Sequence, residues 1–108
     1  MKTYKLTAWG KTYDVQIRKS RYADNKNLAI VVDYFDEDYQ GWMPYANMTV
    51  NLGPLSDGFA YVDANNCPWA EELIAVSGIG TPVGSWKQSG WCMYPLYQFD
   101  VDSIEEVT

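Results

Sequence analysis

The stretch YKLTAWGKTYDVQI, from Tyr4 to Ile17, decides the fold because it predicts a β-hairpin with one apolar face. Gly10 and Lys11 fit a short loop of type II′, in which the leading glycine takes the positive φ. With Trp9 opposite Thr12, the period of a strand pairs apolar side chains on one face: Ala8 with Tyr13, Leu6 with Val15, and Tyr4 with Ile17. The other face is polar, with Thr7 opposite Asp14 and Lys5 opposite Gln16. Such a ribbon belongs to an antiparallel sheet that is covered on one side.

Apolar runs farther along the chain predict more strands. Residues 18–27 are polar and read as a connecting loop, whereas Leu28 to Phe35 lacks alternation, as expected of a central strand covered on both faces. Asp36 to Pro44 (DEDYQGWMP) reads as an exposed acidic loop. Apolar and polar residues alternate again from Tyr45 to Leu52, which predicts another strand. A short strand is predicted at Phe59 to Asp63, after a turn-forming cluster.

The segment from Asn66 to Gly78 predicts the one helix of the chain. Asn66 can cap it, Pro68 suits its first turn, Glu71 and Glu72 complement the positive end of its dipole, and Gly78 ends it. The apolar stripe consists of Trp69, Leu73 and Val76, with Ile74 beside them. A helix of this length is marginal alone, so we expect it to pack on the sheet.

The last third of the chain predicts one long loop and one strand. Residues 79–90 (IGTPVGSWKQSG) are rich in glycine, serine and proline and read as a loop, and Cys92 to Val101 returns to strand chemistry. Pro95 makes that strand an edge strand or moves its start past the proline. We therefore predict an α+β fold in a single domain, residues 1–108, with an antiparallel sheet of four to six strands and one helix packed on it.

Charge is segregated along the sequence. Seven of the eight basic residues lie between Lys2 and Lys26, whereas twelve of the fourteen acidic residues follow Leu28. A net charge of −6 and a pI near 4.3 argue against direct binding to nucleic acid, which needs a basic surface. The longest apolar run, Leu28 to Val32, is far shorter than the roughly 20 residues of a membrane span. We expect a cytoplasmic protein without a membrane partner.

The residue inventory offers little catalytic chemistry. The chain has no histidine, which excludes Ser-His-Asp and Cys-His pairs. Cys67 and Cys92 make a poor zinc set and are expected to be free thiols. Asp36 and Asp38 resemble the start of a calcium-binding EF-hand loop, but its twelfth position is Asn47. A carboxylate pair for glycoside hydrolysis stays open by composition, although nothing places two acids across a cleft. We expect a non-enzymatic protein with no catalytic residue, cofactor or metal.

Acidic clusters are the remaining functional signal. They could align into a band whose charge density imitates nucleic acid, or they could be an ordinary solvated surface. Trp42, Trp86 and Trp91 lie in or beside loops, either as buried anchors of those loops or as side chains that stack on a sugar or a protein partner. The candidate partner-binding residues are Asp36, Glu37, Asp38, Trp42, Glu71, Glu72 and Trp86.

Three segments carry a family resemblance: YADNKNLAIVV (residues 22–32), TVNLGPLSDGFAYVDANNCPWAEELI (49–74) and QSGWCMYPLYQFD (88–100). The chain resembles a family of small proteins of unknown function carried by conjugative elements and phages of Gram-positive gut bacteria. The resemblance implies a context in which small acidic proteins block host defences, including anti-CRISPR and antirestriction proteins. It implies no site residue.

These observations favour a non-enzymatic acidic interaction protein of a mobile genetic element. Its expected partner is a protein, a nucleic-acid-binding defence complex of the host, which it would inhibit in the anti-CRISPR or antirestriction manner. Two alternatives stay open. One is an accessory module that binds a small ligand or a carbohydrate, and the other is a regulatory subunit of conjugative transfer machinery.

Overall fold

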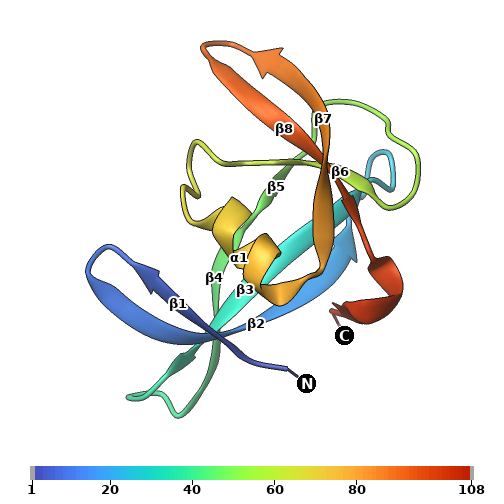
Figure 1. Cartoon of the computed structure of the whole chain (residues 1–108). Helices are drawn as coiled ribbons and strands as arrows, with labels where there is room; N and C mark the ends of the chain where they lie inside the picture. The colour runs from blue at the N-terminus through green and yellow to red at the C-terminus, as the bar shows by residue number, and fades with distance from the viewer. Residues whose placement is uncertain (1, 108) are drawn as a thin grey trace.

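Two antiparallel sheets and one short helix make up the fold, in a computed structural model that describes residues 2–107 (Figure 1). The first sheet has the order β1 (Tyr4–Ala8), β2 (Lys11–Arg21), β3 (Leu28–Asp36) and β4 (Gly41–Asn47), and β9 (Glu105–Glu106) pairs in parallel with β2. The second has the order β5 (Thr49–Val50), β6 (Phe59–Val62), β8 (Cys92–Phe99) and β7 (Gly80–Ser89). The predicted α+β class is confirmed, with the strands divided between two sheets.

The β1–β2 hairpin forms where it was predicted, with a different register. Its loop is Trp9-Gly10, and both residues have positive φ, 54° and 77°, as a type I′ turn requires. Leu6 therefore pairs with Tyr13, and Tyr4 pairs with Val15, two residues away from the predicted partners. An even shift keeps each side chain on its face. The predicted pairs are wrong, whereas the predicted apolar face is correct.

The central strand is confirmed: β3 pairs with β2 on one side and with β4 on the other. Both neighbours extend into segments that were predicted to be loops. β2 continues to Arg21 through part of the expected loop, and β4 begins at Gly41 inside the expected acidic loop. Only residues 37–40 remain as the turn between β3 and β4.

The predicted strand from Tyr45 to Leu52 divides at Met48 and changes sheets. The Met48 backbone N donates to Ile30 O across 2.8 Å, and Met48 O accepts from Asp63 N across 2.7 Å. Met48 therefore connects Ile30 of the first sheet to Asp63, the residue that follows β6 of the second sheet, and its side chain is fully buried. β4 and β5 are thus two strands on either side of this corner.

The helix α1 (Ala70–Ser77) is shorter than predicted and rotated about its axis. Asn66 does not cap it, because its side chain donates to the Asp63 carboxylate instead. Gly78 ends the helix with a φ of 71°, as predicted. Val76 is 68% exposed, so its assignment to the apolar stripe is wrong. The buried positions of the helix are Ala70, Leu73 and Ile74.

The largest difference from the prediction is β7, which replaces the expected loop at residues 79–90. It pairs with β8 from Gly80 to Ser89, with an irregularity between Pro82 and Trp86. β8 pairs with β6 only at Leu96, Tyr97 and Gln98. β8 begins at Cys92, before Pro95, and lies between β6 and β7, so the predicted edge strand and the predicted start after the proline are both wrong. Pro95 itself lies beyond the pairing with β6, so the proline interrupts no hydrogen bond to that strand.

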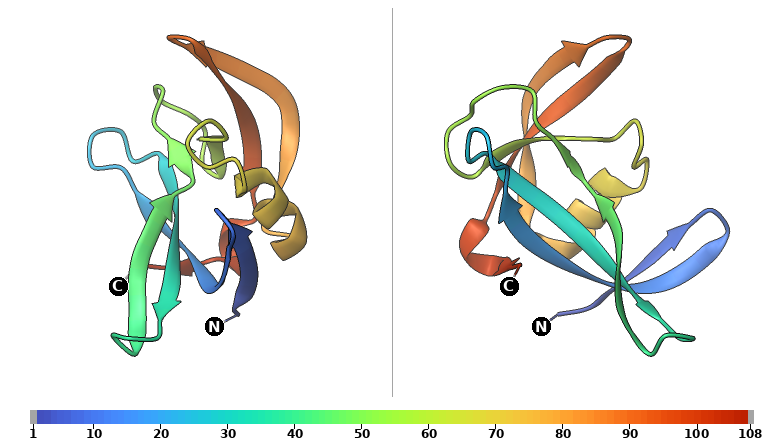
Figure 2. Two further views of the ribbon diagram at one scale, coloured as in Figure 1. Left: turned by 90° about the vertical axis from the view of Figure 1, so that its left-hand side faces the viewer. Right: turned by 180° about the vertical axis from the view of Figure 1, so that it is seen from behind.

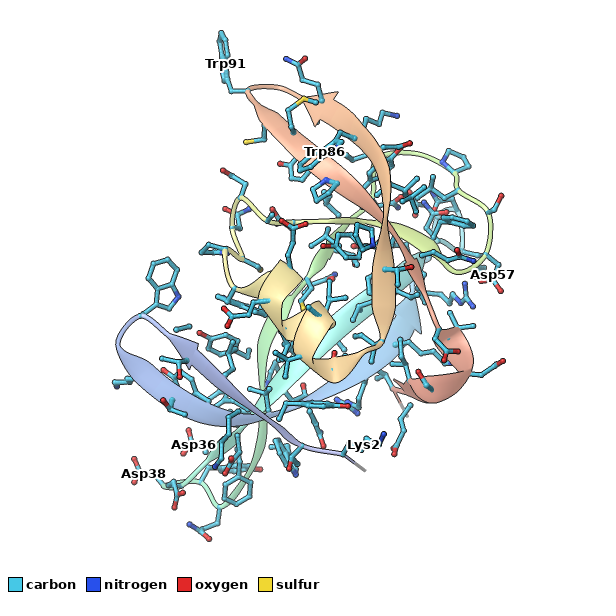
Figure 3. The ribbon with its side chains drawn as sticks, viewed as in Figure 1. Lys2, Asp36, Asp38, Asp57, Trp86 and Trp91 are labelled. Atoms are coloured by element: carbon cyan, nitrogen blue, oxygen red, sulfur yellow. The ribbon has the colours of Figure 1, made fainter. Side chains whose placement is uncertain are left out.

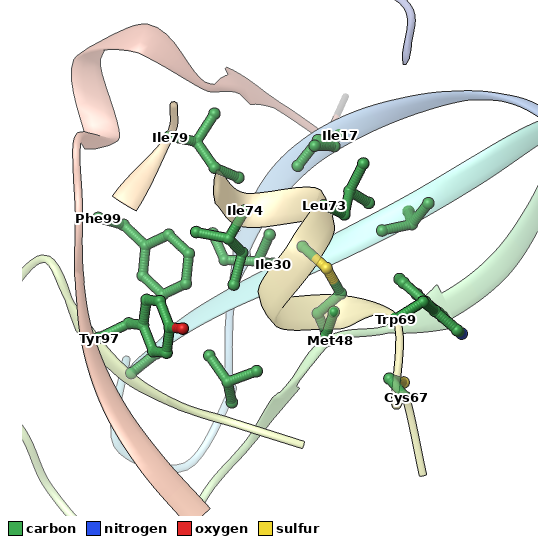
Figure 4. Close-up of a cluster of buried hydrophobic side chains, with 14 of the residues drawn as sticks. Ile17, Ile30, Met48, Cys67, Trp69, Leu73, Ile74, Ile79, Tyr97 and Phe99 are labelled. Atoms are coloured by element: carbon green, nitrogen blue, oxygen red, sulfur yellow. The ribbon is translucent and has the colours of Figure 1, made fainter. Parts of the chain in front are cut away.

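The core lies around α1, in the angle between the two sheets (Figures 1 and 2). Leu73 lies beside Ile17 of the first sheet, and Ile74 lies between Ile30 of the first sheet and Phe99 of the second (Figure 4). Each fully buried aliphatic side chain of this kind contributes about 1.5–3 kcal/mol of burial free energy. None of the helices within residues 2–107 is long and apolar enough to cross a lipid bilayer.

Candidate functional site

The predicted partner-binding residues fall at three places on the molecule. Asp36, Glu37, Asp38 and Trp42 lie together at the β3–β4 turn, at the lower end of Figure 3, whereas Trp86 lies in the β7–β8 hairpin at its upper end. Glu71 and Glu72 lie in the first turn of α1. The structure therefore brings four of the seven residues together.

Asp36 shapes the β3–β4 turn. Its carboxylate accepts hydrogen bonds from the backbone N atoms of Asp38 and Tyr39, both across 2.9 Å, and from the Tyr34 hydroxyl across 3.0 Å. The bond from Tyr39 N, followed by that from Tyr34, lowers the pKa of Asp36 because both stabilise the charged form. Glu37 and Asp38 project from this turn, are exposed, and have no ion-pair partner among residues 2–107.

A groove of about 630 Å³ lies beside this turn, next to the β1–β2 hairpin. We call it the acidic groove. It is lined by Lys5, Lys11, Thr12, Tyr13, Asp14, Tyr34, Phe35, Asp36, Glu37, Asp38 and Tyr45. Its three carboxylates at the turn face one unpaired lysine, Lys11, because Lys5 forms an ion pair with Asp14 within the described residues.

Three tyrosines give the acidic groove its aromatic surface. The ring centroids of Tyr13, Tyr34 and Tyr45 lie 5.3–5.8 Å apart in tilted and edge-to-face arrangements. Tyr45 also packs on Trp69, which connects the cluster to the core. The hydrogen bond to Asp36 raises the pKa of Tyr34, and burial raises the pKa of Tyr45. Tyr34 and Tyr45 therefore stay protonated at neutral pH and can donate hydrogen bonds.

Trp42 lies at the same end of the sheet, on the other face. It pairs with Phe35 across the strands, with ring centroids 5.5 Å apart and an angle of 77° between the rings. Successive residues of a strand alternate faces, so Phe35 and Trp42 project opposite to Tyr34. Trp42 is 38% exposed. It does not line the acidic groove.

Three of the seven basic residues among the first 26 form ion pairs with acidic side chains. Arg18 binds Asp33 across 2.8 Å, Arg21 binds Asp57 across 2.5 Å, and Lys5 binds Asp14. Lys19 and Lys87 donate to backbone carbonyl oxygens. The exposed acidic residues that form no ion pair within residues 2–107 include Glu37, Asp38, Glu72, Asp102 and Glu106. Because these contacts involve most of the basic side chains, acidic side chains outnumber basic ones among the exposed residues that form no ion pair within residues 2–107.

Glu71 has a role in packing. Its carboxylate accepts a hydrogen bond from the Tyr97 hydroxyl across 2.6 Å, between α1 and β8. Burial of Tyr97, together with this bond, raises the pKa of Tyr97 far above its usual range. Glu72 is exposed and makes no such contact among the described residues.

The β7–β8 hairpin is the second notable surface. Residues 81–91 are all exposed, and we call residues 82–95 the arm. Trp86 is 55% exposed and Trp91, at the turn, is fully exposed (Figure 3). The interpretation of these two tryptophans as buried loop anchors is therefore wrong. Composition alone could not reveal the arm, because its exposure depends on how far the hairpin extends beyond the body.

The cysteines are free thiols, as predicted. Cys67 is buried, and burial raises the pKa of its thiol. Among residues 2–107, no group of three or more His, Cys, Asp or Glu side chains is placed to hold a metal ion.

The fold and these surfaces define a small α+β protein with two antiparallel sheets, an acidic groove at one end and an aromatic hairpin at the other. The chain belongs to the family described as Domain of unknown function (DUF4313), whose model matches residues 16–108. Neither a curated protein nor a solved structure matches it. The predicted resemblance to a family of unknown function is confirmed at this level.

Proposed function

We propose that this protein is a non-enzymatic binding protein that docks its acidic groove on the basic surface of a nucleic-acid-binding protein. One observation carries the proposal: the carboxylates of Glu37 and Asp38, which form no ion pair within residues 2–107, project beside a cluster of tyrosines in a groove of about 630 Å³. Carboxylates and aromatic rings together are the chemistry that binds arginine and lysine side chains.

Each part of the groove has a separate contribution to such binding. The carboxylates steer a basic partner toward this end of the molecule and raise the association rate. The tyrosines offer ring faces to a guanidinium group and hydroxyl donors to neighbouring acceptors. Trp42 lies on the other face of the sheet and does not line the groove, so the proposed binding rests on the carboxylates and the tyrosines.

The partner we propose is a nucleic-acid-binding defence complex of the host, which the protein inhibits in the anti-CRISPR or antirestriction manner. The excess of acidic charge supports this, because a protein of net charge −6 complements the groove that receives a phosphate backbone. The resemblance to proteins of conjugative elements and phages supports a mobile genetic element as the source. The proposed encounter takes place in the cytoplasm.

The direct test is a competition experiment. Purified protein is added to a CRISPR effector complex and its labelled nucleic acid, and nucleic-acid binding is measured over a range of salt concentrations. We expect the protein to displace the nucleic acid, with an effect that weakens as salt screens the charges. Undiminished nucleic-acid binding across a panel of CRISPR and restriction complexes would contradict the proposal.

A second candidate function follows from the groove itself. A groove lined by tyrosines and hydroxyl groups also suits a carbohydrate or another small polar ligand. Screening the protein by NMR against a carbohydrate library tests this alternative. Shifts confined to Tyr13, Tyr34 and Tyr45 would favour a small-ligand module over a protein-binding one.

A further inference from the structure

We propose that two copies of this chain associate through the arm, by packing the apolar strip of Trp86 and Met93 on the same strip of the second copy. This surface is separate from the acidic groove, so the inference does not depend on the function proposed above.

The β7 strand and the turn of the arm are uncovered, whereas Pro95 of its β8 strand is buried. Residues 81–91 are all exposed, and β7 is the edge strand of its sheet. A two-stranded hairpin alone is marginally stable in water, and exposed apolar side chains clustered on it mark an interaction surface. Figure 1 shows the arm projecting beyond α1 and the rest of the second sheet.

The strand register defines one apolar face on the arm. Trp86 pairs with Pro95, and Gln88 pairs with Met93, so Trp86, Pro95 and Met93 share a face. Closer to the body, the same face of β8 carries the buried side chains of Tyr97 and Phe99. The core face of the sheet therefore continues through the buried Pro95 into an exposed strip formed by Trp86 and Met93. Trp86 is 55% and Met93 is 52% exposed.

The outer half of the arm contacts the body through Lys87. On the opposite face of the arm, the Lys87 ammonium donates to the backbone O of Leu52 across 2.8 Å. This contact holds the arm against the segment that follows β5, and it occupies the single charged side chain of residues 80–96. The face of the arm that carries Lys87 is thus held against the body, and the strip lies on the other face.

The distribution of charge favours a second copy of the chain as the partner that binds the arm. The chain has a net charge of −6, yet residues 80–96 contain no acidic residue. Two copies repel each other over most of their surfaces, and the arm is where they can approach without facing carboxylates. A basic partner finds no complementary charge on the arm. An apolar, uncharged strip suits a two-fold contact, in which the same patch is used twice.

The apolar area is adequate for a modest dimer. A tryptophan side chain buries about 150–250 Å². Trp86 and Met93 of the strip are each about half exposed, and Trp91 at the adjoining turn and Val83 bring the exposed apolar surface of the whole arm to about 400 Å². A contact that includes all four side chains buries roughly half of a standard interface over the two copies, and polar groups of the arm add the remainder. We expect dissociation in the micromolar range.

Packing of faces, rather than pairing of edges, is the geometry that fits. Pro82 and the irregularity between Pro82 and Trp86 interrupt the free edge of β7. Such features prevent another strand from adding along an edge. The faces of the arm carry no such obstacle.

Sedimentation velocity over a range of protein concentrations tests the dimer. We expect the wild-type chain to dimerise, and Trp86→Ala with Met93→Ala to weaken dimerisation by more than about tenfold. Trp9→Ala is the matched control, because Trp9 is 75% exposed at the turn of another hairpin. A wild-type chain that stays monomeric at all concentrations overturns the proposal, as does a dimer that only Trp9→Ala weakens. A monomer whose arm binds another protein also overturns it.

A measurement on the wild-type sequence covers the case in which the arm variants misfold. Cys92 lies on the face of the arm opposite to the strip and next to the turn, whereas Cys67 is buried. A nitroxide label on Cys92 should show dipolar coupling between two copies, and dilution with unlabelled protein should remove it. Absence of coupling at concentrations that sediment as a dimer places the contact elsewhere and overturns the proposal.

Discussion

The Tyr97 hydroxyl donates a hydrogen bond to the Glu71 carboxylate across 2.6 Å and thereby joins β8 to the first turn of α1. Tyr97 is 5% exposed and packs beside Phe99, with ring centroids 6.1 Å apart. A charged acceptor and a buried donor make this contact stronger than an ordinary hydrogen bond. It positions the helix against the second sheet, and it explains an acidic residue that sequence reasoning assigned to partner binding.

Tyr97→Phe should destabilise the protein by about 1–2 kcal/mol, because Glu71 loses its donor but remains partly hydrated. Urea denaturation at neutral pH measures this loss. Tyr39→Phe is the control, because Tyr39 is 70% exposed, and it should change stability by less than about 0.5 kcal/mol. Equal effects of the two substitutions would contradict the role of the Tyr97–Glu71 bond.

Tyr97 should also contribute to the alkaline limit of stability. Its pKa is raised in the folded state, so the unfolded chain loses the phenolic proton first. The contribution of Tyr97 is therefore complete below about pH 10, the usual tyrosine pKa, and declines as pH rises above it. In Tyr97→Phe the alkaline decline should be shallower than in the wild type, as measured by thermal melting. An unchanged slope would rule out Tyr97 as its source.

Asp36→Asn should flatten the acid limit of stability. The pKa of Asp36 is lowered in the folded state, so its contribution is present above the usual aspartate pKa of about 4 and declines as pH falls through the folded value. Melting temperatures of the variant should thus fall less steeply below that pH. Asp38→Asn, at an exposed position of the same turn, is the control. A steeper fall in Asp36→Asn than in the wild type would contradict the assignment.

Arg18→Ala should cost roughly 2–3 kcal/mol, because it leaves the Asp33 carboxylate, 6% exposed, with Gln16 as its remaining side-chain partner. Lys5→Ala removes the exposed pair with Asp14 and should cost less than about 1 kcal/mol. Denaturant unfolding of both variants measures the difference. Similar losses of stability in the two variants would show that burial of Asp33 contributes little to the energy of its ion pair.

Ile74→Ala should destabilise the protein by about 2–5 kcal/mol, since Ile74 is fully buried between the helix and the second sheet. Val76→Ala lies on the same helix at a site that is 68% exposed, and it should change stability by less than about 0.5 kcal/mol. Thermal denaturation compares the two. A larger loss of stability in Val76→Ala than in Ile74→Ala would contradict the burial of Ile74 and support the predicted stripe that includes Val76.

Local patterns predicted the β1–β2 hairpin and the central strand because their apolar faces are set by residue spacing. The error in the hairpin register did not move any side chain to the other face, since Leu6 and Val15 remain buried. The helix prediction failed at Val76 because the packing of α1 between two sheets, rather than its own periodicity, sets which arc is buried. Met48 carries no sequence signal of the change of sheet, which depends on its contacts with Ile30 and Asp63.

β7 was missed for a physical reason. Its residues include two glycines, a proline and two serines, which have low strand propensity, and the strand exists because it pairs with β8. The acidic turn at Asp36 was predictable from composition. The distance between that turn and Trp86 was not, because only the fold places the two at opposite ends of the molecule.

The most direct measurement of the central claim compares two charge reversals in the competition experiment with a CRISPR effector complex. Glu37→Lys with Asp38→Lys reverses the acidic groove and leaves Asp36 to shape the turn. Asp102→Lys with Glu106→Lys makes the same change in net charge at exposed sites near the C-terminus. The account predicts that the first pair abolishes displacement of the nucleic acid and that the second retains it. Equal loss or equal retention in the two variants would contradict a specific role for the acidic groove.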